Sequence, residues 1–249
     1  MNTAEQYDAF AADYHWLYAD YGLSGARALD ENKDVLTAAG PKAKILDCSC
    51  GVGIFAIALA RLGHEVWGSD GSRGMIDQAL PAAREANVEV SLQRCAWADL
   101  PNQFAERFDL VFCLGNAIGH VRNRDEMVES LRAMRAVLKD GAKLVLDSRN
   151  WELIWNRKTR FTNYPWRERS GQRCLPIHIW NFPDRFGDAQ TIEVTLVFDT
   201  GESASIRSYP VVYYPYRFDE LAERLRCAGF SDIQTDFREE RPAYRVVAA

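Results

Sequence analysis

The residues best suited to chemistry in this sequence each follow a short apolar run. Asp47 and Asp70 close two such runs, and Asn116 and Arg149 stand just beyond two later ones. Short apolar runs bounded by turn residues predict buried strands. In sheets of parallel strands, ligands bind beyond the carboxyl ends of the strands. We therefore expect these four side chains, together with Trp97 after a further run, to converge on one site.

The segment Asp47-Cys-Ser-Cys-Gly-Val-Gly53 joins a predicted strand to a predicted helix. Gly51 and Gly53 permit a sharp turn and let a ligand approach the backbone closely. The first N–H groups of the following helix would face that ligand. Asp70 lies 19 residues after Gly51, an interval typical of a carboxylate that accepts hydrogen bonds from ribose hydroxyls. The segment therefore predicts a nucleotide-like ligand.

Two kinds of nucleotide fit this loop. The spacing Gly51-x-Gly53-x-x-Ala56 matches the relaxed dinucleotide fingerprint, which would indicate a nicotinamide-dependent dehydrogenase. However, Asp47 would repel a pyrophosphate at this place. S-adenosylmethionine instead carries an ammonium and a sulfonium, and an acidic rim favours both positive charges. The electrostatics therefore favour the sulfonium ligand, with the dehydrogenase as the alternative.

Strand-like and helix-like segments alternate through the middle of the chain. Ser72 is a natural N-cap for one of the helices, and Gly63 and Gly141 are expected to stop two others. Such alternation predicts an α/β fold with parallel strands and helices on both faces of the sheet. The strands are predicted over residues 43–47, 65–70, 88–95, 108–114 and 142–147.

The N-terminal segment, residues 4–21, is rich in aromatic residues at three- and four-residue steps, which predicts one face of an amphipathic helix. This face either packs on the domain or forms a lid whose tyrosines line a ligand pocket. Gly22-Leu-Ser-Gly25 predicts a break, and a second helix is predicted over residues 26–39. The residues on the aromatic face are Tyr7, Phe10, Tyr14, Leu17, Tyr18 and Tyr21.

Residues 152–216 change in character. The run Thr191–Phe198 alternates between polar and apolar residues, and Asp199-Thr-Gly-Glu202 is a turn signal between two strand-like runs. We therefore predict a small antiparallel sheet that covers the ligand pocket. Beyond it we predict a helix and two closing strands, the last of them antiparallel, over residues 218–228, 231–237 and 243–247.

Composition excludes several classes of partner. The formal net charge is -5 without a basic block, which argues against nucleic acid. No apolar run reaches membrane-spanning length and no signal-peptide layout is seen, so we expect a cytoplasmic protein without a membrane partner. Cysteines inside predicted strands and helices indicate reduced thiols, and no cluster with metal-ligand spacing is seen, so we expect no metal. The sequence leaves open whether the protein forms a homo-oligomer.

The loop at residues 47–53 resembles the D-x-x-x-G-x-G loop of class I methyltransferases, and the resemblance covers about residues 43–150. It implies a doubly wound, mostly parallel, seven-stranded Rossmann-like sheet that binds S-adenosylmethionine and releases S-adenosylhomocysteine. Two positions depart from the family's pattern. Ser49 replaces the first loop glycine, and Ala96 stands where relatives have an adenine-contacting acid, which leaves Asp99 for that contact.

The resemblance also implies which residues bind this cofactor. The loop at residues 47–53 would hold the methionine part, Asp70 the ribose hydroxyls, and Met75 the adenine. Helix capping is the alternative role for Asp70, and core packing for Trp97. The residues assigned to the cofactor are Tyr14, Tyr18, Asp47, Cys48, Gly51, Gly53, Asp70, Gly71, Met75, Ala96, Trp97 and Leu114.

Two further segments resemble glycine N-methyltransferase and related glycine/sarcosine-methylating enzymes. Cys113–His120 is similar to their L-G-N-S-x-x-H segment, and Leu146–Trp151 to their D-x-R-N-Y segment, with tryptophan in place of the tyrosine. The stretches Asp13–Tyr18 and Tyr213–Pro215 are also similar. With these segments, the resemblance extends over most of the chain.

In that family the asparagine and the arginine of these segments bind the amino-acid acceptor, which implies this role for Asn116 and Arg149. A guanidinium binds a carboxylate through two parallel hydrogen bonds, and the Asn116 amide would accept from the acceptor nitrogen. His120 either relays the amine proton or is a structural group. Tyr213 and Tyr214 either reach the acceptor or pack their strand. Positioning alone can supply ~7–11 kcal/mol, so no strong base is required.

We therefore predict an S-adenosylmethionine-dependent methyltransferase for the amine of a small carboxylate-bearing acceptor such as glycine or sarcosine. The alternatives are O- or N-methylation of a larger acceptor, and a non-catalytic module that only binds the cofactor. The catalytic residues are Asn116 and His120, and the acceptor residues are Asn116, Arg149, Tyr213 and Tyr214. The predicted parts are a helical lid, a cofactor-binding core, an antiparallel insertion and a closing helix with strands, over residues 1–42, 43–150, 151–216 and 217–249.

Overall fold

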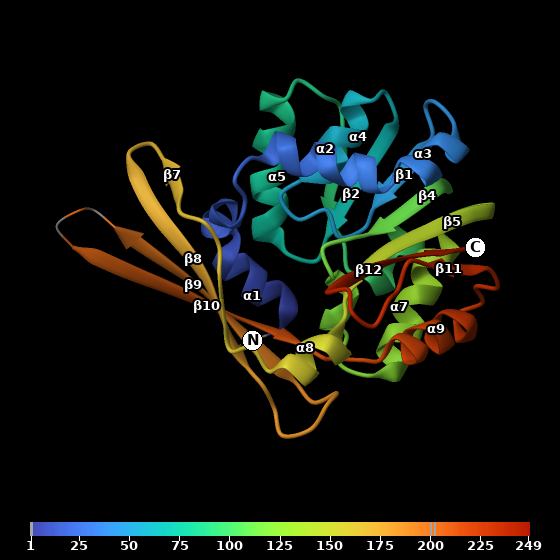
Figure 1. The fold of residues 1–249 in the computed structure, drawn as a ribbon. Helices are drawn as coiled ribbons and strands as arrows, with labels where there is room; N and C mark the ends of the chain where they lie inside the picture. The colour runs from blue at the N-terminus through green and yellow to red at the C-terminus, as the bar shows by residue number, and fades with distance from the viewer. Residues whose placement is uncertain (1, 200, 202) are drawn as a thin grey trace.

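A computed structural model describes residues 2–199, 201 and 203–249, and its centre is a seven-stranded sheet (Figure 1). The strand order is β11-β12-β5-β4-β1-β2-β3. Strands β1 to β5 are parallel, and β12 is antiparallel to both of its neighbours. This confirms the predicted mostly parallel sheet. The strands are β1 Lys44–Asp47, β2 Glu65–Asp70, β3 Ser91–Arg94, β4 Phe108–Cys113, β5 Leu138–Arg149, β11 Ile233–Thr235 and β12 Ala243–Ala248.

Helices cover both faces of this sheet because successive strand residues point to opposite sides. Ile45 of β1 is buried with Leu59 of α4 on one side. Its neighbour Leu46 is buried on the other side with Leu131 of α7 and Leu225 of α9. The two apolar cores make the sheet doubly wound, as predicted. The helices of this part are α4 Ile54–Arg61, α5 Arg73–Glu85, α6 Leu100–Gln103, α7 Arg124–Ala136 and α9 Phe218–Cys227.

Several predicted boundaries in this part are wrong. Helix α7 does not run to Gly141, because it ends at Ala136 and β5 already begins at Leu138. Leu138 pairs with Phe108, and the register of the two strands then shifts before the next pair. The early start of β5 is therefore set by pairing with β4, which the local sequence does not show. Strand β3 is also shorter than predicted.

The N-terminal residues form α1 Thr3–Phe10, the 3-10 helix Ala11–Leu17, α2 Tyr21–Glu31 and α3 Lys33–Ala39. The break predicted at Gly22–Gly25 is wrong, because these residues lie inside α2. Asp20 caps that helix by accepting from the Leu23 N–H at 2.7 Å. A Cβ atom at Gly25 would lie 3.0 Å from the Ala58 Cβ of α4. This glycine therefore permits close helix packing and does not end a helix.

The insertion forms a separate antiparallel sheet, as predicted, in the order β10-β9-β8-β6 with β7 paired to β8. Figure 1 shows it projecting from the core, with α1 between the two. Thr200 and Glu202 of the predicted turn lie outside the described residues. The short helix α8 Trp151–Arg157, capped by Asn150, was not predicted. The strands are β6 Phe161–Asn163, β7 Arg167–Arg169, β8 Gln172–Asn181, β9 Gln190–Asp199 and β10 Ala204–Tyr213.

Helix α1 and the segment after it connect the core to the insertion. Asp8 accepts hydrogen bonds from the Ser72 hydroxyl at 2.6 Å and from the Gly74 N–H at 2.7 Å, at the first turn of α5. Farther along, Asp13 binds Arg207 of β10 with both carboxylate oxygens, each at 2.8 Å. The N-terminal segment is thus attached to both parts of the molecule. Across the described residues, no helix combines the length and the apolar character needed to cross a bilayer.

We expect Asp8→Ala to weaken the attachment of α1. The change removes the acceptor for two hydrogen bonds at a helix N-terminus, where capping groups contribute about 0.5–2 kcal/mol. Urea unfolding should show a lower free energy of unfolding, and limited proteolysis should cut the N-terminal segment sooner. Asp30→Ala is the matched control, because Asp30 is exposed and its carboxylate has no hydrogen-bond or ion-pair partner among the described residues. Equal behaviour of the two variants would contradict this role for Asp8.

Candidate functional site

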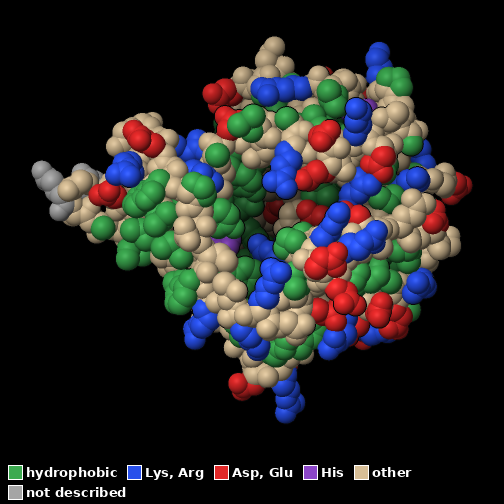
Figure 2. All heavy atoms as spheres, in the orientation of Figure 1, with side chains coloured by type: hydrophobic (Ala, Val, Ile, Leu, Met, Phe, Trp, Pro, Cys, Tyr) green, Lys and Arg blue, Asp and Glu red, His purple; other side chains and the backbone are tan. Residues whose placement is uncertain are grey.

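A cavity of ≈ 1560 Å³ lies beyond the carboxyl ends of β1, β2, β4 and β5, and the surface is hollowed in this region (Figure 2). It is lined by residues from the core, from α1 and from the start of the segment after β10. Most of the residues predicted from the sequence meet here. Those that line the cavity are Tyr14, Tyr18, Asp47, Cys48, Gly51, Asp70, Gly71, Met75, Ala96, Trp97, Leu114, His120 and Tyr214.

Four predicted residues, all within the described part of the chain, do not line this cavity: Gly53, Asn116, Arg149 and Tyr213. Gly53 precedes α4 with a φ of 85°, and a Cβ atom there would lie 3.2 Å from the Cβ of Ala79. Its left-handed backbone and its contact with α5 account for a glycine at this position. The other three gather behind the cavity, beneath the insertion.

The loop after β1 is held in place by its surroundings. Asp70 accepts from the Gly51 N–H with one carboxylate oxygen and from the Ser72 N–H with the other, both at 2.9 Å. The Trp97 indole N–H donates to the Cys48 carbonyl at 2.8 Å. Since a carboxylate has about four acceptor positions, Asp70 keeps room for further donors at the cavity. Trp97 therefore both lines the cavity and braces the loop.

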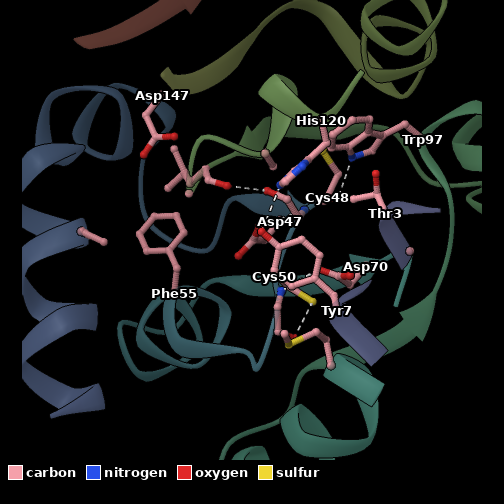
Figure 3. Close-up of a pocket in the computed structure, with 18 of the residues that line it drawn as sticks. Thr3, Tyr7, Asp47, Cys48, Cys50, Phe55, Asp70, Trp97, His120 and Asp147 are labelled. Carbon is pink, nitrogen blue, oxygen red and sulfur yellow. Dashed lines mark hydrogen bonds between the residues drawn. The ribbon is translucent and has the colours of Figure 1, made fainter. Parts of the chain in front are cut away.

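Three buried acids line the cavity. Asp47, Asp70 and Asp147 all line it (Figure 3), and no ion pair links them to a basic side chain of the described residues. Burial raises the pKa of Asp47 to about 7, and the charges of the other two acids act in the same direction. Burial also raises the pKa of Asp70 and of Asp147. Uncompensated buried carboxylates favour a positively charged ligand.

His120 lies at the inner wall of the cavity, where both ring nitrogens are occupied. Nδ1 is 2.8 Å from the Val212 carbonyl, to which it must donate, and Nε2 accepts from the Tyr7 hydroxyl at 3.0 Å. The Tyr213 ring stacks on it at 4.2 Å between centroids. Burial lowers the pKa of His120 to about 4, so the ring is neutral at pH 7. Of its two predicted roles, this geometry favours the structural one, because a proton relay would have to pass through Tyr7.

The ends of β4 and β5 hold each other by reciprocal hydrogen bonds. Asp147 accepts from the Asn116 N–H at 2.6 Å, and Asn116 Oδ1 in turn accepts from the Arg149 N–H at 2.8 Å. The Asn116 oxygen, predicted to accept from the acceptor nitrogen, already accepts from this backbone group. The buried Nδ2 has no hydrogen-bond partner among the described residues. Asn116 is thus able to donate to a ligand while it positions Arg149.

The Arg149 guanidinium is enclosed by aromatic rings. Its Cζ atom lies 5.0 Å from the ring centroid of Tyr213, 5.4 Å from that of Trp180 and 5.8 Å from that of Trp151. No ion pair with an acid is formed within the described residues, and Nη1 has no hydrogen-bond partner. A buried cation without an acidic partner is costly. This place, the aromatic chamber, is therefore suited to an anionic group.

Other buried polar atoms around the chamber also lack hydrogen-bond partners among residues 2–199, 201 and 203–249. They come from the ends of β4 and β5, from α8 and from the insertion. A cluster of such atoms in a folded protein points to a ligand. They are Asn116 Nδ2, Trp151 Nε1, His178 Nε2 and Gln190 Nε2.

The chamber and the cavity share a wall. The hydroxyls of Tyr7 and Tyr213 are 3.5 Å apart, and Tyr7 lines the cavity. Tyr7 belongs to the aromatic face that the sequence offered either as packing or as a pocket wall, whereas sequence reasoning missed His178 and Trp180. The alternation of inward and outward residues along β8 could have placed the last two on one face. Their distance from Arg149 depends on how the insertion folds back, which the sequence pattern does not show.

The sequence is similar to those of known methyltransferases. A family model described as a methyltransferase domain matches residues 45–141. The glycine/sarcosine N-methyltransferase of Parasynechococcus marenigrum (strain WH8102) is 32% identical over 206 residues, which cover 82% of this chain and 70% of that protein. The enzyme of the same name from Aphanothece halophytica is 27% identical over 202 residues, 79% of this chain and 70% of that protein.

Solved structures share the fold. An S-adenosylmethionine-dependent methyltransferase from Clostridium acetobutylicum ATCC 824 has a TM-score of 0.74 at 15% identity, covering 97% of this chain and 98% of that one. Streptomyces venezuelae DesVI has a TM-score of 0.72 at 17% identity, covering 100% and 98%. The likeness extends over both the central sheet and the insertion.

We expect the free energy of unfolding to depend on His120 between pH 7 and pH 5. The unfolded ring takes up a proton near pH 6.5, whereas the folded ring stays neutral down to about pH 4, so acid favours the unfolded chain in this window. The contribution of this group should fall by about 1–2 kcal/mol. Urea unfolding at both pH values should show a larger loss for the wild type than for His120→Gln. His64→Gln, at a partly buried histidine, should reduce this pH-dependent loss of unfolding free energy by less. Equal losses in the wild type and in His120→Gln would contradict the assignment.

Proposed function

We propose that this chain, which belongs to the family of S-adenosylmethionine-dependent methyltransferases that includes the glycine/sarcosine N-methyltransferases, methylates the amine of a small acceptor that carries a carboxylate. Glycine and sarcosine are the first candidates. The observation that carries the proposal is the buried Arg149 guanidinium, which has aromatic neighbours and forms no ion pair with an acid within the described residues. A carboxylate would supply the missing charge and accept two parallel hydrogen bonds.

The cavity fits the cofactor on its charge. Asp47 and Asp147 are buried, and neither forms an ion pair with a basic side chain among the described residues, which suits an ammonium and a sulfonium. We assign the loop after β1 to the methionine part, Asp70 to the ribose hydroxyls and Met75 to the adenine. When bound, S-adenosylmethionine supplies a methyl group activated by its positive sulfur, and S-adenosylhomocysteine is the product.

The chain's own contribution to the reaction is chiefly positioning. Arg149 would fix the acceptor carboxylate, and Asn116 Nδ2 would donate to it from the side. The amine would then lie toward Tyr7 and the shared wall, with water excluded by the N-terminal segment and the insertion. Aromatic faces and tyrosine oxygens there favour the positive charge that develops on the amine. Alignment of this kind accounts for ~7–11 kcal/mol of barrier reduction in oriented reactions.

We expect Arg149→Met to impair acceptor binding and to leave cofactor binding intact. Loss of hydrogen bonds to a charged group should lower kcat/KM for glycine or sarcosine by about 10- to 100-fold, chiefly through KM. Release of S-adenosylhomocysteine measures the rate, and the thermal shift with S-adenosylhomocysteine reports folding and cofactor binding. Arg160→Met is the matched control, because Arg160 is exposed and donates to Asn181. An unchanged acceptor KM in Arg149→Met would overturn the proposed carboxylate site.

A screen of the wild type separates the proposal from its rivals. Turnover of small carboxylate-bearing amines supports it. Turnover of larger alcohols or amines alone would indicate the broader acceptor class. Binding of S-adenosylmethionine without turnover of any amine would indicate a non-catalytic module.

We expect the affinity for S-adenosylmethionine to fall as the pH drops below 7. The pKa of Asp47 is about 7 in the folded protein, so the carboxyl becomes protonated below this pH and loses its attraction for an ammonium. Calorimetric titrations at pH 6, 7 and 8 should show the trend. Asp47→Asn should bind more weakly at pH 8 and show a flatter profile. Asp77→Asn, at an exposed ion pair with Arg73, serves as the control. A profile for Asp47→Asn identical to that of the wild type would rule out this role.

A further inference from the structure

We infer that His178, oriented by Tyr164, determines acceptor specificity by binding an uncharged hydrogen-bonding group, such as a hydroxyl or an amide, on the side chain of the acceptor. The preferred acceptor is then an amino acid larger than glycine. This inference rests on the proposed function, in which Arg149 holds the carboxylate of the same molecule.

The first support is the position of His178 beside the chamber. Strand β8 alternates between buried and partly buried residues, and His178 and Trp180 both lie on its buried face. The two rings are 6.4 Å apart, and the Trp180 ring lies 5.4 Å from the Arg149 guanidinium. One aromatic ring therefore separates the imidazole from the predicted carboxylate site.

The second support is the hydrogen bonding of the ring. Nδ1 of His178 contacts the Tyr164 hydroxyl at 3.3 Å, whereas the buried Nε2 has no hydrogen-bond partner in the described part of the chain. His120, the other fully buried histidine of the site, has partners at both nitrogens. Leaving a buried polar atom unpaired carries a desolvation cost unless a ligand completes it. The contrast between the two rings indicates that Nε2 of His178 is a hydrogen-bonding site for a ligand.

The third support concerns charge. Burial, and next the positive charge of Arg149, lower the pKa of His178 to about 4, so the ring is neutral near pH 7. A neutral imidazole does not compensate a second buried carboxylate or ammonium, and burying such a charge is costly. It is also a poor proton acceptor at that pKa. An uncharged donor or acceptor on the substrate is the group that this environment favours.

Glycine would leave His178 unpaired. With its carboxylate on Arg149 and its amine toward Tyr7, glycine has no further polar atom for the imidazole. A hydroxyl or an amide carried on the α-carbon supplies one. The ring of Tyr164 packs edge-on against His178 at 4.9 Å, which holds the imidazole in one orientation for that atom.

The test compares matched acceptors with the wild-type enzyme. L-serine is compared with L-alanine, and L-asparagine with the similarly sized L-leucine, with glycine and sarcosine as references. We expect kcat/KM for at least one polar acceptor to exceed that of its apolar partner by about 10- to 100-fold. Ratios near one in both pairs would overturn the inference while the proposed function stands. If no carboxylate-bearing amine is methylated, the proposed function fails and this inference with it.

Variants then assign the preference to the ring. His178→Leu should lower the polar-to-apolar ratio by about 10-fold or more, Tyr164→Phe should lower it less, and His178→Gln should restore part of it. His64→Leu, outside the site, is the control with an unchanged ratio. The thermal shift with S-adenosylhomocysteine verifies that each variant is folded. If His178→Leu lowers kcat/KM equally for both members of a pair, the residue only packs the chamber, and the inference is wrong.

Discussion

The reciprocal hydrogen bonds between the ends of β4 and β5 are the constraint on which the whole site depends. Asp147 fixes the backbone of Asn116, and the side chain of Asn116 fixes the backbone of Arg149. Asn116 adopts a left-handed backbone with a φ of 59° to make both contacts. Asparagine tolerates this conformation better than most residues. One short turn thereby positions Asp147 at the cavity and Arg149 at the aromatic chamber.

Charge is distributed unevenly across this turn. Within the described residues, the three buried acids of the cavity form no ion pair with a cation, and Arg149 in the chamber forms no ion pair with an acid. Each arrangement is unfavourable for the empty protein, because buried charges need compensation. Two ligands of opposite local charge would complete both halves. The empty site therefore lowers the free energy of unfolding relative to a site with paired side chains. Ligand binding would offset this loss.

The parts of the fold that follow local rules were predictable from the sequence. The alternation of strands and helices, the glycine loop and the Ser72 cap all act within a few residues, and the structure has them where expected. The errors arose where distant segments decide the outcome. Gly25 sits inside a helix because α4 lies against it, and β5 begins early because β4 pairs with it.

The candidate site divides in the same way. Most residues predicted to line the cofactor cavity do so, because the carboxyl ends of parallel strands must meet. The roles of individual atoms were harder to predict from the sequence. Nothing local to Asn116 indicates that its oxygen accepts from the Arg149 N–H, and nothing local to β8 indicates that His178 lies beside the same chamber. These facts depend on the path of the insertion, which is fixed by long-range packing.

The attachment of the N-terminal segment has a consequence for how ligands enter and leave. Asp8 binds this segment to α5 and Asp13 binds it to β10. While both contacts are formed, they oppose a separation of the insertion from the core. Helix α1 has only 8 residues. Short helices can detach at a lower free-energy cost than the core unfolds. Ligand exchange would then proceed by local unfolding of α1, and the turnover rate would depend on how often that helix unfolds.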